Sequence, residues 1–414
     1  MDAANGSDRA SGQTTADAFQ SAEHAISVAS KGDSIYLMPG VHDAFLVDKN
    51  GLRISGFPTA TIQGGNQGYA ILLDATQCNF GAGSVLEDLW LQGNGTGSVG
   101  LLASGGGKIS AVLRRLEFHQ LRIGVQIKAS GAGPAMDGQG GRLGGGSGGG
   151  SGFGGGFGMM GLNKPQILDC YFGGDGGGID LPDVAVSIHA GRQRGLNAQL
   201  RGNVIQDYPV GIDILGAVSI NPIIDDNDIL EADTGIRISA GLGSGGNGSI
   251  FGDGLIQFDS IRISNNRLIS LNSGGGGGGG GDLPPEGISL ISAGDHQMSG
   301  WIRQNTVDGF LVGIAFSGGD SGGQDLPSPG LDMAIQANVL RGGGGGVDLP
   351  PGQSRGILLN ADPEMELDSL VENNQIHFFE VGCWVHGWFG ANLQLNANSY
   401  TDVLSDEVLV NTGP

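Results

Sequence analysis

A phrase of apolar and polar positions recurs through the second half of the chain. In each copy an Asn stands two residues before an aliphatic residue, and after a gap comes Gly-aliphatic-x-aliphatic. The Asn residues are Asn203, Asn227, Asn266, Asn305, Asn338 and Asn374, and the answering segments begin at Gly211, Gly235, Gly287, Gly313, Gly356 and Gly382. Self-similarity at a spacing of roughly 20–50 residues indicates a solenoid, in which each unit buries its apolar face by stacking on its neighbours.

The local chemistry of the phrase predicts parallel strands joined by tight corners. In the segment Gly235-Ile-Arg-Ile, the two Ile side chains share one face and Arg237 points outward. The Asn is predicted at a corner, where its side chain bonds buried backbone groups and its own backbone tolerates the left-handed region. Asn side chains stacked in this way would form a hydrogen-bonded ladder. The Gly is predicted at a second corner, where it supplies backbone freedom.

The N-terminal region begins differently. Residues 1–16 are predicted to be a flexible lead-in, and the apolar spacing from Asp17 to about Ser30 predicts one short helix. A stretch Gly-Asp-Ser-Ile-Tyr-Leu from Gly32 follows, with a short Leu-x-Ile-x-Gly strand from Leu52. This opening and the later Asn and Gly repeats resemble the right-handed parallel β-helix proteins of the pectate-lyase-like superfamily. The resemblance implies an all-β solenoid over residues 17–400, with 401–414 as a C-terminal tail or cap.

Gly-rich segments interrupt the repeat. The largest, residues 131–161, has 17 Gly in 31 positions, and four shorter ones (173–182, 274–285, 318–329 and 342–351) share a Gly run followed by Asp-Leu-Pro. The Asp and Pro residues of this motif are Asp180, Pro182, Asp282, Pro284, Asp325, Pro327, Asp348 and Pro350. Gly-rich loops serve as flexible spacers in many proteins. Four copies of one motif also fit loops that pack against each other or against another subunit.

Composition and charge narrow the possible partners. Gly accounts for 83 of 414 residues without a three-residue period, which excludes collagen. The net charge is −22, and the chain from residue 165 onward carries 9 Arg, no Lys and 30 acidic residues. Such a surface repels nucleic acid and anionic lipid. No apolar run is long enough to span a membrane. The polar, acidic N-terminus lacks the apolar core of a signal peptide.

Three distant cysteines, Cys78, Cys170 and Cys383, form neither a disulfide framework nor a metal cluster. Cys170 occupies the position where other repeats carry Asn, which favours a buried small side chain. The seven His residues lack the spacing of a metal site, and we predict no metal centre. One degenerate nonapeptide-like segment at residues 243–254 leaves calcium open.

Catalytic candidates are few. The strongest is the run Asp225, Asp226 and Asp228, followed by Arg237 in the next strand. Carboxylates and a base are what polysaccharide hydrolases and lyases require. The register of the repeat places Asp213 beside Arg237, Asp228 beside Arg267, and Asp225 between Arg201 and Ser264. Alternating charges on neighbouring rungs equally predict structural pairs on a solvated face. The motifs of polygalacturonases, classical pectate lyases and alginate epimerases are missing from the chain.

Aromatic residues gather near the last repeat. Trp384, Trp388 and Phe389 could stack on sugars or bury against another subunit, and a hydrophobic end cap explains them as well.

Two hypotheses of function therefore stand. In the first, the protein is a non-catalytic structural or adhesive β-helix, extracellular or on a cell or particle surface, whose Asp-Leu-Pro loops mediate self-association. In the second, it is a carbohydrate-active enzyme, a lyase or hydrolase, acting on an acidic polysaccharide. The superfamily resemblance supports the second only at the level of fold.

Overall fold

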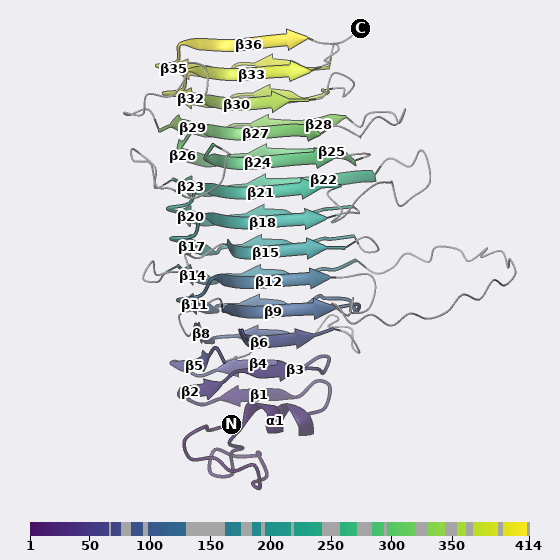
Figure 1. Cartoon of the computed structure of the whole chain (residues 1–414), viewed down its shortest axis with the longest axis vertical. Helices are drawn as coiled ribbons and strands as arrows, with labels where there is room; N and C mark the ends of the chain where they lie inside the picture. The colour runs from purple at the N-terminus through teal and green to yellow at the C-terminus, as the bar shows by residue number, and fades with distance from the viewer. Residues whose placement is uncertain are drawn as a thin grey trace, which may run out of the picture.

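The computed structural model shows a tall stack of strands that run in one direction along each face (Figure 1). The structure describes residues 1–65, 68–75, 84–93, 98–129, 162–174, 184–191, 195–216, 219–241, 257–270, 284–293, 296–319, 330–343, 354–361, 367–387 and 392–411. The strands pair in parallel into three sheets of twelve, which we name sheets A, B and C. Each successive triplet of strands is one coil, so that β1, β2 and β3 form coil 1 and β34, β35 and β36 form coil 12.

The strand bounds are as follows. Sheet A contains β1 Ser34–Leu37, β4 Arg53–Gly56, β7 Val85–Glu87, β10 Val112–Arg114, β13 Gln166–Leu168, β16 Gln199–Arg201, β19 Ile223–Asp225, β22 Gln257–Ser264, β25 His296–Arg303, β28 Leu331–Gln336, β31 Leu370–Glu372 and β34 Gln394–Asn396. Sheet B contains β2 Gly40–Asp43, β5 Ala60–Gln63, β8 Trp90–Gln92, β11 Glu117–His119, β14 Tyr171–Gly173, β17 Val204–Gln206, β20 Asp228–Leu230, β23 Arg267–Ile269, β26 Thr306–Phe310, β29 Val339–Gly342, β32 Gln375–His377 and β35 Ser399–Thr401. Sheet C contains β3 Phe45–Val47, β6 Tyr69–Asp74, β9 Val99–Gly105, β12 Ile123–Ala129, β15 Val184–Ala190, β18 Val210–Gly216, β21 Thr234–Ala240, β24 Glu286–Ala293, β27 Val312–Gly319, β30 Arg355–Asn360, β33 Val381–Gly387 and β36 Ser405–Asn411.

The chain is a right-handed parallel β-helix, as the repeat predicts. Inward side chains of equivalent strands stack into one continuous core, in which Ile236 pairs with Ile288 and Phe118 stacks on Phe172 with ring centroids 4.5 Å apart. No coil has a core of its own, so each depends on its neighbours for burial of its apolar face.

The N-terminal end is covered by the helix α1, Ala22–Val28, which is shorter than the sequence predicts. Ser21 caps it by accepting a hydrogen bond from the His24 amide. Residues 1–16, predicted as a flexible lead-in, make hydrogen bonds to the rest of this end: the Asp2 amide donates to the Phe19 carbonyl, and the N-terminal amine donates to the Tyr36 carbonyl. At the other end, most of the predicted tail 401–414 belongs to the solenoid, because Ser405–Asn411 pairs with β33 as strand β36.

A column of Asn residues fills the corner between sheets A and B. Each Asn from Asn203 to Asn374 donates from Nδ2 and from its backbone amide to the Oδ1 of the Asn on the next coil. The predicted ladder is therefore present, and it continues to Asn398, which the sequence repeat did not include. The same position holds Leu89, Leu116 and the buried Cys170 in earlier coils, so a small or apolar side chain replaces the amide there.

Two details of the corners differ from the predictions. The left-handed residue is the one before each ladder Asn, such as Asp226 with φ 58° and Ala337 with φ 54°. The repeated Gly residues are needed for space rather than for an unusual φ. A Cβ on Gly235 would lie 2.6 Å from the Gly287 carbonyl oxygen, because the coils approach closely in this column.

The Gly-rich insertion 131–161 and nearly all of the four Asp-Leu-Pro segments lie outside the described residues, as does Cys78. Within the described residues, no helix is long and apolar enough to cross a membrane.

Candidate functional site

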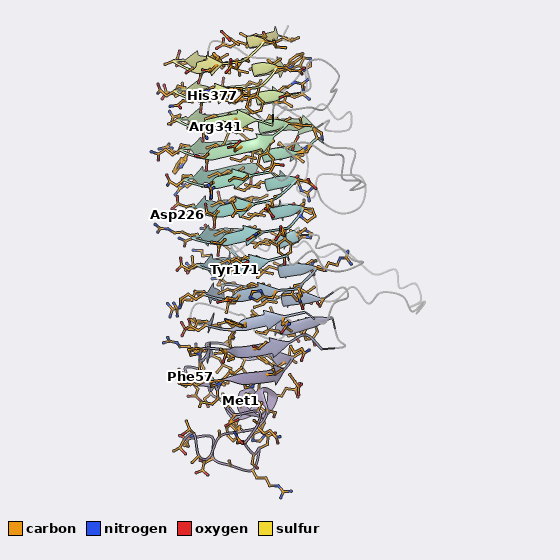
Figure 2. All side chains as sticks on the ribbon, turned by 90° about the vertical axis from the view of Figure 1, so that its left-hand side faces the viewer. Met1, Phe57, Tyr171, Asp226, Arg341 and His377 are labelled. Atoms are coloured by element: carbon orange, nitrogen blue, oxygen red, sulfur yellow. The ribbon has the colours of Figure 1, made fainter. Side chains whose placement is uncertain are left out.

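The acidic run at residues 225–228 is divided between two faces of the β-helix. Asp225 ends β19 in sheet A, Asp226 forms the corner, and Asp228 begins β20 in sheet B. Figure 2 shows Asp226 projecting at the edge of the solenoid. Arg237 lies on a third face, in β21 of sheet C. The fold therefore does not converge these four residues on one point, because consecutive residues at a corner point away from each other.

Two of the three predicted charge pairs are ion pairs, and the third pair is in register. Asp213 faces Arg237 on the next coil, with Oδ1 and Nε 2.8 Å apart, and Asp225 is 3.5 Å from Arg201. Asp225 also accepts from Ser264 at 2.9 Å. Asp228 and Arg267 are register partners on adjacent coils. These contacts agree with the interpretation of the run as part of an outward charge ladder.

Sheet C holds a cluster around Arg237 in which two carboxyl groups have opposite pKa shifts. Burial alone would raise the pKa of Asp213, but hydrogen bonds from His189 and Arg237 outweigh it, and the net shift is downward. Burial raises the pKa of Glu286, and the Ser289 hydrogen bond and the charge of Arg237 offset only part of this effect. The cluster thus favours an ionised Asp213 beside a Glu286 that retains its proton to higher pH.

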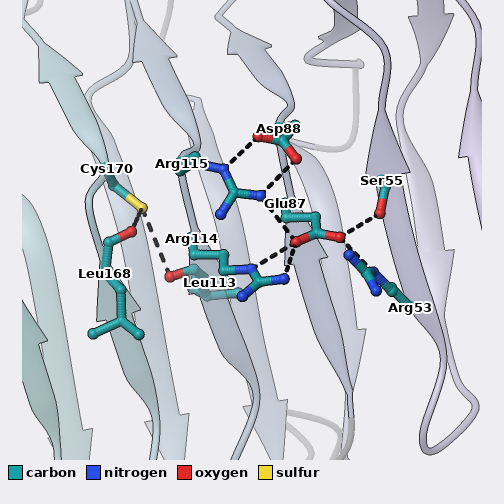
Figure 3. Close-up of polar contacts among 9 residues, drawn as sticks. All are labelled: Arg53, Ser55, Glu87, Asp88, Leu113, Arg114, Arg115, Leu168 and Cys170. Atoms are coloured by element: carbon teal, nitrogen blue, oxygen red, sulfur yellow. Dashed lines mark hydrogen bonds and ion pairs between the residues drawn. The ribbon is translucent and has the colours of Figure 1, made fainter.

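Sheet A carries a second ion cluster in its early coils (Figure 3). The carboxylate of Glu87 is 1% exposed and lies between Arg53 on coil 2 and Arg114 on coil 4, with Ser55 donating to it at 2.7 Å. Arg115 links Glu87 to Asp88. Burial would raise the pKa of Glu87, yet the hydrogen bonds from Ser55, Arg53 and Arg114 lower it to about 2. Every carboxylate here is already paired with arginine, so the cluster is structural.

The later coils of sheet A form a groove that contains two carboxylates, one on each of two adjacent coils. Its volume is about 530 Å³, and its lining consists of Gly300, Asp332, Met333, Ala334, Asp368, Leu370 and Asn392. Leu331 and Leu367 form a parallel bridge, and the residues that follow them, Asp332 and Asp368, therefore occupy equivalent outward positions on coils 10 and 11. Equivalent positions of neighbouring parallel strands lie about 4.8 Å apart.

The polar surroundings of this pair are sparse. Asp332 is exposed and Asp368 is half-buried. The Oδ1 atom of Asp368 is buried and finds no hydrogen-bond partner among the residues that the structure describes. Asn392, equivalent to Asp368 on coil 12, brings an amide to the same groove.

An aromatic ring with two guanidinium groups borders the groove. Trp301 of β25 is the register partner of Ala334, a groove residue. The guanidinium carbons of Arg262 and Arg303 lie 4.8 Å and 4.6 Å from the Trp301 ring centroid. Nε of Arg303 is buried and lacks an acceptor within the described parts of the chain. This face therefore offers cationic groups to an anion in a protein that is otherwise strongly acidic.

The remaining predicted site residues are placed as follows. Trp384 is half-buried on β33 and packs against Arg355, whose guanidinium carbon is 4.6 Å from the ring centroid. Trp388 and Phe389 lie outside the described residues. So do Asp180, Pro182, Asp282, Asp325, Pro327, Asp348 and Pro350, whereas Pro284 is described and exposed. Within the parts of the chain that the structure covers, no three His, Cys, Asp or Glu side chains converge as they would around a metal ion.

Comparison with known proteins adds little beyond the fold. No family model and no curated protein matches the sequence. One similar solved structure is the native GH136 lacto-N-biosidase from Eubacterium ramulus, with a TM-score of 0.43 and 11% sequence identity over 97% of this chain and 67% of that chain. This likeness concerns the fold alone, and no residue role is transferred from it.

Sequence reasoning missed the groove because its parts are far apart in the chain. Asp332 and Asp368 belong to different coils separated by a Gly-rich segment, and neither is in a recognisable motif. A coil-by-coil alignment of the outward positions in sheet A would have found the pair.

Proposed function

We propose that this protein binds a polysaccharide in the groove of sheet A and hydrolyses it with Asp332 and Asp368. One observation carries the proposal: two carboxylates occupy equivalent outward positions on adjacent coils and line the same groove. The strand spacing of about 4.8 Å is close to the separation of about 5 Å between the two carboxyl groups of retaining glycoside hydrolases. One carboxyl group protonates the glycosidic oxygen, and the other attacks the anomeric carbon to form a glycosyl-enzyme that water then hydrolyses.

The neighbouring groups support an acidic sugar as substrate. The guanidinium groups of Arg262 and Arg303, which lie over the Trp301 ring, attract a sugar carboxylate. The overall charge of −22 repels a polyanion at long range, so these two cations supply the local attraction.

The test is hydrolysis of a panel of acidic polysaccharides (polygalacturonate, alginate and hyaluronate). Hydrolysis is measured as the release of reducing ends. Asp332→Asn and Asp368→Asn are each expected to lower the rate by at least about 100-fold. Asp225→Asn, on the same sheet but outside the groove, serves as the matched control and should keep the rate. The first product should retain the anomeric configuration of the substrate. The proposal is wrong if the wild type releases no reducing ends or if both Asn variants remain active.

We also propose self-association through the Asp-Leu-Pro loops as a second function. The observation that favours it concerns segment 274–285: the Pro285 carbonyl accepts hydrogen bonds from the Leu311 and Val312 amides at 3.1 Å each, and Pro284 beside it is exposed. One end of this segment is thus anchored to the β-helix at the surface. Under both proposals, we place the protein outside the cell or on the surface of a cell or particle.

Deletion of residues 274–283 tests this second function, because it keeps the anchoring prolines. Light scattering and negative-stain imaging, with and without calcium, should show assemblies for the wild type and dispersed particles for the deletion. Equal association of both proteins contradicts the assembly role.

A further inference from the structure

A second aromatic surface lies on sheet B, far from the groove in the coil order. Trp90, His119 and Tyr171 project outward from β8, β11 and β14 on the consecutive coils 3, 4 and 5. The Trp90 and His119 ring centroids are 6.0 Å apart, and those of His119 and Tyr171 are 5.6 Å apart. We name these three residues the ring ladder; Figure 2 labels Tyr171 on this face.

The rings are splayed and accessible. Their planes are inclined by 57° for the first pair and 42° for the second, so they do not cover each other as stacked rings do. Trp90 is 40% exposed, and the His119 side chain is 29% exposed. Gly173 leaves room for Tyr171, because a Cβ at this position would lie 3.0 Å from the tyrosine ring. The ladder therefore presents ring surface to solvent. Burial of an indole ring such as that of Trp90 is more favourable than its exposure to water.

The polar groups around the ladder are amides and one carboxylate. Glu117 contacts His119 with Oε2 and Nε2 3.3 Å apart, and its side chain is 40% exposed. The two outward columns over coils 2 to 6 are Thr61, Trp90, Glu117, Tyr171 and Val204, and Gln63, Gln92, His119, Gly173 and Gln206. These ten positions contain no Lys or Arg, and the nearby Arg115 is already paired with Glu87 and Asp88.

We infer that the ring ladder binds neutral sugar residues of a polysaccharide. The apolar face of a sugar ring packs on Trp90 and Tyr171, while its hydroxyl groups bond the Gln amides and Glu117. Phosphate-bearing and acidic ligands are disfavoured by Glu117 and by the net charge. Three coils span only about 15 Å, too little for the roughly 800 Å² that a stable protein partner covers. The inference rests on the proposed polysaccharide function, and it assigns binding of neutral sugar residues to a face other than the one proposed to hydrolyse acidic ones.

Affinity electrophoresis through gels that contain galactomannan, xyloglucan or mixed-linkage β-glucan tests the ladder. The wild type should be retarded by at least one of these neutral polysaccharides. Trp90→Ala and Tyr171→Ala should each weaken binding about tenfold, a typical loss for an aromatic contact. Trp90→Phe, which keeps a ring, should retain most of the retardation, and Thr306→Ala on the same sheet should retain all of it.

The outcome separates this surface from the groove. Trp301→Ala on sheet A should leave retardation by neutral polysaccharides unchanged. If the proposed hydrolysis fails, retardation that depends on Trp90 still supports the ladder. The inference is overturned if no neutral polysaccharide retards the wild type, or if Trp90→Ala and Tyr171→Ala migrate as the wild type does. Retardation that is lost only in Trp301→Ala also overturns it, since the sugar then binds in the groove.

Discussion

Asn374 donates from Nδ2 to the Oδ1 of Asn398 at 3.0 Å, and this bond is the last link of a ladder that begins at Asn203. Each interior amide uses its oxygen to accept from the previous coil and its nitrogen to donate to the next coil and to a backbone carbonyl. Buried polar groups are tolerated only when they are satisfied, so each member of the ladder depends on its two neighbours. The ladder thus ties coils 6 to 12 together along one corner.

Removal of an interior member should destabilise the protein strongly. In Asn305→Ala, the backbone amide and Nδ2 of Asn266 lose their acceptor, and the Oδ1 of Asn338 loses the Nδ2 donor of residue 305. Only the donor from the Asn305 backbone remains. Buried groups without partners cost about 1–3 kcal/mol each, and we expect a loss of about 2–4 kcal/mol in unfolding free energy. Guanidinium-chloride denaturation measures it.

The end of the ladder supplies the control for this prediction. Asn398 is only half-buried, and its loss deprives Asn374 of an acceptor and the Val371 carbonyl of a donor. We expect Asn398→Ala to cost about 1 kcal/mol. Equal losses for Asn305→Ala and Asn398→Ala would mean that the ladder does not stabilise through its interior burial.

Much of this fold could be predicted because the repeat is local. The spacing of Asn203 and Gly211 within one coil already implies a corner and a strand. Asn398 was missed because the strand after it begins Ser405-Asp-Glu, without the Gly-aliphatic segment that follows the other ladder residues. The sequence therefore predicts the corners and strands of a regular coil. The prediction fails for an end coil that lacks the inward-facing apolar residues.

The candidate site could not be predicted in the same way, because outward positions leave no apolar pattern to follow. Asp225 and Asp228 are close in sequence and point from different sheets, whereas Asp332 and Asp368 are distant and share a groove. The coil length varies with each Gly-rich loop, so residue spacing does not reveal which outward residues stack. Only the register of neighbouring strands decides this.

The arginine-paired Glu87 predicts a specific pH dependence of stability. Its pKa falls from 4.5 to about 2 on folding, so the paired carboxylate stabilises the fold fully above pH 4.5, and this contribution is lost as the pH falls through 2. The shift corresponds to at most about 3 kcal/mol. The stability difference between the wild type and Glu87→Gln should therefore be largest at pH 7 and shrink between pH 4.5 and 2, as measured by denaturation at several pH values.

The control for Glu87 is Asp88→Asn. Asp88 contacts Arg115 from a half-exposed side chain, and such a pair contributes no more than about 1 kcal/mol. A stability difference for Glu87→Gln that is independent of pH would show that the variant acts through packing and not through its charge.

The corner residue Ala337 offers a stabilising substitution. It has a φ of 54°, in the left-handed region, where Ala is strained and Asn is tolerated. The equivalent corners on neighbouring coils hold Asn373 and, two coils earlier, Asn265. Ala337→Asn should raise the unfolding free energy by about 0.5–1 kcal/mol, as measured by denaturation. The same change at Ser399, an exposed strand position, should not stabilise, and a gain there of equal size would contradict the explanation by φ.

The two carboxyl groups around Arg237 should respond oppositely to loss of charge. The folded pKa of Glu286 is raised mainly by burial, so its ionisation opposes folding and its stability contribution declines as the pH rises above the unfolded value. Glu286→Gln should therefore stabilise the protein at pH 7 relative to pH 4.

Asp213 has the reverse sign. Burial acts against its ionisation, but the bonds from His189 and Arg237 lower its folded pKa, so its contribution is present at pH 7 and is lost as the pH falls through that pKa. Asp213→Asn should therefore destabilise the protein at pH 7 and have less effect in acid. Thermal unfolding of both variants at pH 4 and pH 7 gives the comparison. If both substitutions change stability in the same direction at pH 7, then the opposite pKa shifts of Asp213 and Glu286 are wrong.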